Sequence, residues 1–223
     1  MASEPDPPWP REAAGAIAHE FLGWLRALGA VLATPRRFGA AWASGDIRPL
    51  NPLAYSLNTL AVAGPATALL VHLAGIEDDV LPLWAQLFKP LLPWIYNLVW
   101  LVPVHFALRA LGGRRRLRTT IGASFYAGGP IHLLRIFTVP LQLQQLLHPH
   151  DRRVAIVSAL CGLVMFLLFT IYSTALLAGA QRVSRWRAAL VVIVFFLVSV
   201  FFWSELRMRA GQAGMHLIRA MIT

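Results

Sequence analysis

The chain has 223 residues, of which 57% are hydrophobic and 13% are charged, and its mean hydropathy is +0.60. Soluble domains carry about 25% charged residues, so this composition excludes a soluble globular protein, because too little polar sequence remains to cover so apolar a core. The net charge of +10 lies in short clusters between apolar runs, which indicates membrane topology and excludes a nucleic-acid partner.

Residues 1–11 are acidic and rich in proline, and we expect them to be disordered. They lack the basic start and the apolar stretch of a cleaved secretion signal. The first membrane-spanning helix is therefore expected to serve as the insertion signal.

Residues 12–50 form a lead-in that we expect to be helical, amphipathic and cytoplasmic. A stripe of apolar residues that includes Trp24 recurs at helical spacing, opposite His19 and Arg26, and predicts an amphipathic helix that lies on the membrane surface with Trp24 in contact with the headgroups. A second short piece carries the residues expected to contact anionic lipid, Arg36, Arg37, Phe38 and Trp42. An alternative is that both pieces pack against the cytoplasmic end of the bundle, and the two interpretations are compatible.

Five long apolar runs follow within residues 51–205. Each is close to the roughly 17 to 25 helical residues that cross a bilayer core, and the runs cover residues 53–74, 90–111, 121–146, 154–179 and 188–204. The fold class is therefore an all-α membrane protein with a bundle of five transmembrane helices. Residues 81–88 are interrupted by a proline and are expected to be interfacial or re-entrant, and residues 206–223 form a tail.

Basic residues set the expected orientation. Thirteen of them precede the first run or lie in the second and fourth connections between runs, whereas six lie on the other side. The N-terminus is thus expected in the cytoplasm and the C-terminus outside. Because nearly all the basic residues are arginine and alanine is abundant, the composition is typical of a GC-rich bacterial genome and predicts a multi-pass protein of the inner (plasma) membrane.

Glycine and proline mark an expected packing seam between the first and third runs. The third run contains Tyr126, Gly128, Gly129 and Pro130, and the first contains Gly64 and Pro65. Glycine lets helix backbones approach closely, and proline bends a helix. An equally acceptable interpretation is that these residues are simply more frequent in membrane helices.

All ten acidic residues lie outside the five runs, which removes the usual material for a proton relay or a cation site. Away from the ends of the runs, the basic side chains are those of His105, His132 and Arg135. They predict either a polar pocket, for an anionic lipid headgroup or a solute, or an arginine that stabilises packing through hydrogen bonds to neighbouring helices.

No phosphate-binding loop and no local nucleophile motif is present, so we expect neither an enzyme nor a bound cofactor. The single cysteine, Cys161, allows no disulfide within the chain. His72, His148 and His150 lie beside acidic loop residues and define a metal-handling alternative, although their spacing matches no known ligand motif and solvated loop charges are the ordinary explanation.

The order of these features resembles the Yip family, the five-span membrane proteins named for interaction with Ypt/Rab GTPases, and in particular its bacterial branch. The matching stretches are Thr34 to Phe38, Arg48 to Leu53 and Tyr126 to Pro130, and the likeness extends over residues 15 to 205. The resemblance implies the fold and topology. The Asp-Leu-Tyr-Gly-Pro stretch of the eukaryotic members is absent, so a Rab-type partner is not implied.

The function predicted from the sequence is a non-enzymatic adaptor or organiser of the membrane. Its partners would be the lipid bilayer, anionic phospholipid, and other membrane proteins or further copies of the same chain. A small permease for a neutral or anionic solute is the first alternative, and a metal-handling membrane protein is the second.

Overall fold

The computed structural model describes residues 9–73, 91–148 and 150–202, and this part of the chain contains seven helices and no strand. The helices are α1 (Trp9–Ala33), α2 (Pro35–Ser44), α3 (Pro52–Leu73), α5 (Leu91–Ala110), α6 (Leu117–Leu147), α7 (Arg152–Gln181) and a final described helix, Arg185–Phe202. The fold is therefore all-α, as predicted. The expected re-entrant piece, 81–88, and the tail, 206–223, lie outside the described residues.

The five apolar runs correspond to helices whose bounds differ from the predicted bounds by a few residues. Local signals account for two of the helix ends, one in a run and one in the lead-in. The Asp151 side chain accepts a hydrogen bond from the backbone N–H of Arg153 at 2.8 Å and caps the start of α7. In the lead-in, α2 ends before Gly45, which has a φ of 88°, a left-handed backbone conformation that glycine adopts easily.

The first helix begins earlier than predicted. Trp9, Pro10 and Arg11 belong to α1, although we expected residues 1–11 to be disordered. Proline is acceptable in the first turn of a helix, because the N–H that it lacks has no partner there in any case. The remainder of that segment lies outside the described residues.

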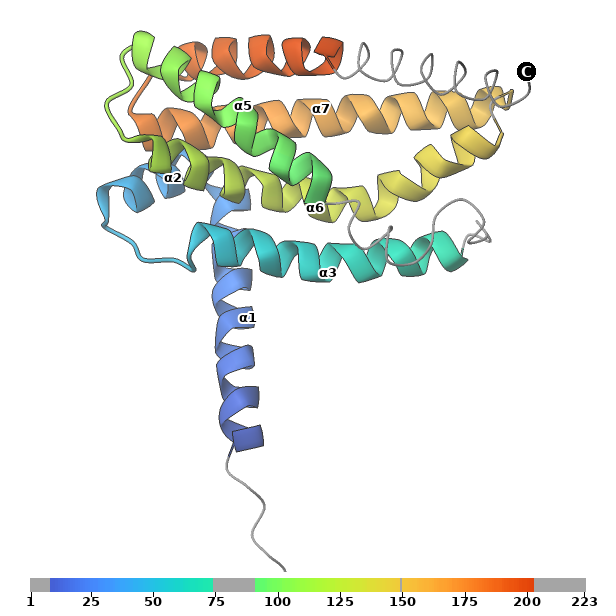
Figure 1. Cartoon of the computed structure of the whole chain (residues 1–223), viewed down its shortest axis with the longest axis horizontal. Coiled ribbons are helices and arrows are strands. Elements are labelled where there is room, and N and C mark those ends of the chain that lie inside the picture. The colour runs from blue at the N-terminus through green and yellow to red at the C-terminus, as the bar shows by residue number, and fades with distance from the viewer. Residues whose placement is uncertain (1–8, 74–90, 149, 203–223) are drawn as a thin grey trace, which may run out of the picture.

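Figure 1 shows how the helices are arranged: α3, α6, α7 and the final described helix run alongside one another, and α5 crosses them obliquely. The main packed pairs are α3 with α6, α6 with α7, and α2 with α7. The long helix α6 bends along its length and contains Pro130 and Pro140, the residues that most often bend a helix.

The first helix runs across the bundle, and its N-terminal half extends beyond it (Figure 1). Trp24 and Val31 are buried against the bundle, and the indole N–H of Trp24 donates to the hydroxyl of Thr59 in α3 at 2.8 Å. Nearer the N-terminus the apolar residues of α1 are exposed, with Ile17 69% and Phe21 46% accessible. The apolar stripe read from the sequence is thus divided between a packed part and an open part.

Four of the described helices are long and apolar enough to cross a membrane: Gly15–Ala33 within α1, Pro52–Leu73, Arg152–Gln181 and Arg185–Phe202. The chain is therefore a helical membrane protein. This set includes α1, which the sequence suggested as a surface helix, and it does not include α6. In α5, the piece Leu98–Ala110 counts as a shorter apolar helix.

The tightly packed core lies towards the end of the bundle where α2 contacts α7. Leu108 of α5, Tyr126 of α6 and Leu176 of α7 are each fully buried there. Further along α7, apolar residues such as Leu163 and Leu167 are exposed, as expected for side chains that face lipid. One end of the bundle is consequently well packed, and the helices are less closely packed towards the other end.

Candidate functional site

Tyr126 is the centre of an aromatic cluster at the packed end. Its ring contacts Phe38 at 4.8 Å and Trp42 at 5.4 Å, both edge-on, and lies 5.0 Å from the ring of Tyr55. Its hydroxyl donates to the backbone carbonyl of Leu50. The cluster therefore joins the lead-in and the start of α3 to α6, and aromatic pairs of this geometry contribute roughly 0.5–1.5 kcal/mol each beyond their buried area.

These contacts show where the predicted membrane-surface residues lie. Phe38 is 4% exposed and Trp42 is half-buried against Tyr126, so both rings pack on the bundle. Arg36 and Arg37 are exposed beside them. Trp24 is buried as well, and it is Phe21 and Leu25 that present the open apolar face of α1. Trp24, Phe38 and Trp42 therefore pack against the bundle, which is the alternative interpretation of the lead-in.

The close approach of α3 to α6 is at Gly129. A Cβ placed on Gly129 would overlap the hydroxyl and ring of Tyr55. Pro130 is also buried. By contrast, a Cβ on Gly64 would meet no atom within 4 Å, Pro65 is exposed, and the nearest atom to a Cβ on Gly128 belongs to His132 of the same helix. Of the glycines named in the predicted seam, only Gly129 therefore lies against another helix.

A second glycine contact, between α2 and α7, was not predicted. A Cβ on Gly39 would lie 2.7 Å from the carbonyl oxygen of Leu176, and a Cβ on Gly179 would overlap the carbonyl oxygen of Arg36. The two backbones touch directly, as small residues allow in membrane helix pairs. The signal in the sequence was weak, because Gly39 and Gly179 are 140 positions apart and neither is part of a Gly-Pro pair.

The packed end of the bundle is strongly basic. Hydrogen bonds join its connections, from the Arg114 N–H to the Gln181 carbonyl at 3.4 Å and from the Arg187 guanidinium to the Leu111 carbonyl at 3.0 Å. Helix α2, the connection after it, and the connections α5–α6 and α7 to the final described helix all lie at this end. They and the adjoining helix turns contain eleven arginines: Arg36, Arg37, Arg48, Arg109, Arg114, Arg115, Arg116, Arg118, Arg182, Arg185 and Arg187. Within the same segments the single carboxylate is that of Asp46.

His105 belongs to a buried hydrogen-bond network at this end. Its Nδ1 lies 2.8 Å from the hydroxyl of Thr120, which accepts a bond from the Gln181 side-chain amide at 2.7 Å. The Gln181 side-chain carbonyl in turn accepts from the backbone N–H of Arg115 at 3.1 Å. His105, Thr120 and Gln181 are 4%, 0% and 0% exposed. The network links α5, α6 and α7, so the surroundings of His105 are structural.

His132 and Arg135 have a different setting from His105. Both line a cavity between the helices, which His105 does not line. The structure therefore separates the three intramembrane residues into one that is capped by polar neighbours and two that face a shared space. That separation was not predictable, because all three are isolated polar residues in apolar runs.

The metal alternative depends on loops of which the structure describes only a part. His72, His148 and His150 are exposed, and the acidic residues 77–79 lie outside the described residues. Among the residues that are described, no group of three or more His, Cys, Asp or Glu side chains is placed to hold a metal ion.

Comparisons of the chain with protein-family models, with curated proteins and with solved structures give no match.

Proposed function

We propose that this protein is a non-enzymatic, five-span protein of the bacterial inner membrane that binds anionic phospholipid at its basic end and lies on the bilayer surface through α1. The spans would be α3, α5, α6, α7 and Arg185–Phe202. Two observations support this count: these helices run alongside or obliquely past one another while α1 runs across them (Figure 1), and none of the five contains an acidic residue.

The basic end is the observation on which the proposal rests. Eleven arginines against one carboxylate would face the anionic headgroups of the cytoplasmic leaflet, where each basic residue contributes about 1 kcal/mol of attraction. Ten of these arginines are exposed and Arg115 is half-buried. By the positive-inside rule, this end is cytoplasmic. An odd number of spans then puts the C-terminus outside.

The position of α1 supports a surface role for it. If the long direction of the bundle is the membrane normal, a helix that runs across it lies along the membrane plane. Its open apolar face, with Ile17 and Phe21, would then enter the boundary between headgroups and acyl chains, as interfacial helices do. The same plan, a cytoplasmic lead-in followed by five spans, is the one that the Yip-like resemblance implies. A role as an adaptor for other membrane proteins remains part of this proposal.

Spin labels in α1 test the surface position. Cysteines introduced as Phe21→Cys and Arg26→Cys, in a Cys161→Ala background, place one label on the open apolar face and one on the polar face. In proteoliposomes, the label at position 21 is expected to be more accessible to oxygen and the label at position 26 to a water-soluble nickel reagent. Equal access of both labels to the nickel reagent would contradict a helix embedded in the interface.

Lipid retention tests the basic end. The variant Arg36→Gln/Arg37→Gln/Arg116→Gln/Arg118→Gln removes four exposed charges there. Native mass spectrometry of the full chain should show fewer retained phosphatidylglycerol molecules than in the parent protein, with no change for phosphatidylcholine. The matched control is Arg152→Gln/Arg153→Gln at the opposite end of α7, where both residues are exposed. Equal losses in the two variants would rule out a specific role for the basic end.

A further inference from the structure

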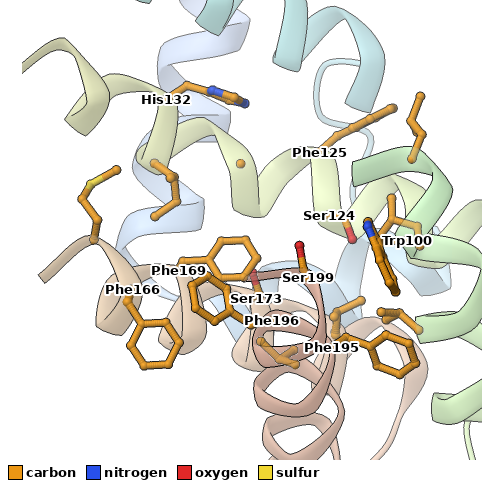
Figure 2. A pocket seen from close by; sticks show the side chains of 18 of the residues that line it. Trp100, Ser124, Phe125, His132, Phe166, Phe169, Ser173, Phe195, Phe196 and Ser199 are labelled. Carbon is orange, nitrogen blue, oxygen red and sulfur yellow. The ribbon is translucent and has the colours of Figure 1, made fainter. Parts of the chain in front are cut away.

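A cavity of about 420 Å³ lies between α5, α6, α7 and the final described helix. This volume falls within the roughly 300–1,000 Å³ of small-molecule sites. The described residues that line it are largely apolar and include five phenylalanines and one tryptophan, together with four serines. Phe166 and Phe169 of α7 lie against Phe196 of the final helix at 4.5 and 5.9 Å, and Figure 2 shows His132 of α6 on the opposite side from this group.

The cavity is long and its two ends differ. Along α6 it extends from Ser124 to Thr138, which at 1.5 Å per residue is about 21 Å. Ser124 is near the basic end, within two turns of Leu117, where α6 begins. Arg135 and Thr138 line the opposite end. A cation is therefore present at one end of an elongated space whose middle is lined by phenylalanine rings.

Arg135 has no partner of opposite charge among the residues that the structure describes. None of the helices that line the cavity contains an acidic residue, and Arg135 makes no hydrogen bond or ion pair with any residue in the described part of the chain. It is only partly exposed. An unpaired cation at membrane depth costs roughly 2.5 kcal/mol or more, so the site gains most from a ligand that brings an anion.

We propose that this cavity binds an anionic single-chain amphiphile, with its oxyanion headgroup on Arg135 and its acyl chain along the phenylalanine-lined middle. Arginine binds a phosphate or carboxylate through paired charge-assisted hydrogen bonds. The acyl chain fills the space between the apolar side chains, and its packing contacts with them give the remaining affinity. A bare anion would use only Arg135 and leave the apolar walls uncovered.

This site is independent of the proposed binding at the basic end, since Arg135 lies at the opposite end of the cavity. It also differs from a permease path for a polar solute. Such a path would need charged or strongly polar groups along its length, whereas on α7 and the final described helix the polar lining among the phenylalanine side chains consists of Ser173 and Ser199 (Figure 2).

Titration calorimetry on the delipidated full chain in detergent tests the headgroup and the chain separately. The probes are palmitoyl lysophosphatidic acid, palmitoyl lysophosphatidylcholine and inorganic phosphate. We expect the first to bind most tightly and phosphate alone to bind weakly. Arg135→Gln should weaken binding of the lysophosphatidic acid by about tenfold or more, because a charge-assisted hydrogen bond is lost. Arg152→Gln, the same change at an exposed position of α7 outside both the cavity and the basic end, should leave it within about twofold.

Equal binding of the two lipids would overturn the role of Arg135, and tight binding of inorganic phosphate would overturn the role of the chain. A measurement on the unmodified protein guards against an unfolded variant. Palmitate with a diazirine in its chain should label cavity residues such as Met165 and Phe166 after irradiation. Labelling confined to exposed residues of α7, such as Leu163 and Ile171, would overturn the proposal.

Discussion

Gly179 of α7 lies against the backbone of Arg36 in α2, so closely that a Cβ on the glycine would overlap the arginine carbonyl oxygen. The lead-in is thereby packed into the bundle through main-chain contact as well as through its aromatic rings. The two exposed arginines of α2 are consequently held at a fixed position on the basic end.

Gly179→Ala should destabilise the protein, because backbone atoms cannot move aside as a flexible side chain can. Overpacking of this kind costs about 1–3 kcal/mol. Thermal unfolding in detergent should show a lower midpoint. The matched control is Gly162→Ala in the same helix, where a Cβ meets no atom within 4 Å and the gain in helix propensity is about 1 kcal/mol. Destabilisation by both substitutions would mean that the α2–α7 contact is not the cause.

Gly129→Ala should weaken the packing of α3 on α6. The added methyl group would overlap the ring of Tyr55, which is 0% exposed and has Tyr126 beside it, so the ring has no space to move into. We expect a loss of about 1–3 kcal/mol, measured as a lower unfolding midpoint. Gly64→Ala in α3 is the control, since a Cβ there has open space. If Gly64→Ala were equally harmful, the predicted seam would extend further along α3 than the contacts indicate.

The two central tyrosines should respond differently to removal of the hydroxyl. Tyr126→Phe loses the hydrogen bond to the Leu50 carbonyl and should cost about 1 kcal/mol. The buried Tyr55 hydroxyl has no hydrogen-bond partner among the described residues, so Tyr55→Phe should be neutral or stabilising. Equilibrium unfolding of both variants checks this order, and a larger loss for Tyr55→Phe would contradict it.

Gln181→Leu should destabilise the end of the bundle where the polar network lies. The change removes the bonds to the Thr120 hydroxyl and the Arg115 N–H, and leaving buried groups unpaired costs about 1–3 kcal/mol. Faster hydrogen exchange of the backbone N–H of Arg115 would report the lost bond. Thr119→Val, at a less buried position beside Thr120, serves as the control. Unchanged exchange at Arg115 would show that the network contributes nothing there.

The positions of the apolar helices could be predicted from the sequence. Length and hydropathy predicted five runs whose helices begin and end within a few residues of the observed bounds, because helix formation in lipid depends on local apolar composition. Gly129 was recognised as a packing residue for a similar reason, since the Gly-Gly-Pro sequence is itself a local signal.

The roles of individual side chains depended on contacts between distant segments. Periodicity put Phe38 and Trp42 on a helix but could not distinguish a face towards lipid from a face towards Tyr126, because both surroundings are apolar. The same ambiguity covered the three polar residues of the spans: the sequence showed that His105, His132 and Arg135 were isolated from any acid. Only the packing of α5, α6 and α7 decided that His105 is hydrogen-bonded to Thr120 whereas Arg135 faces a cavity. The physical reason is that these surroundings are formed by helices that are far apart in the sequence, and no local pattern encodes how those helices cross.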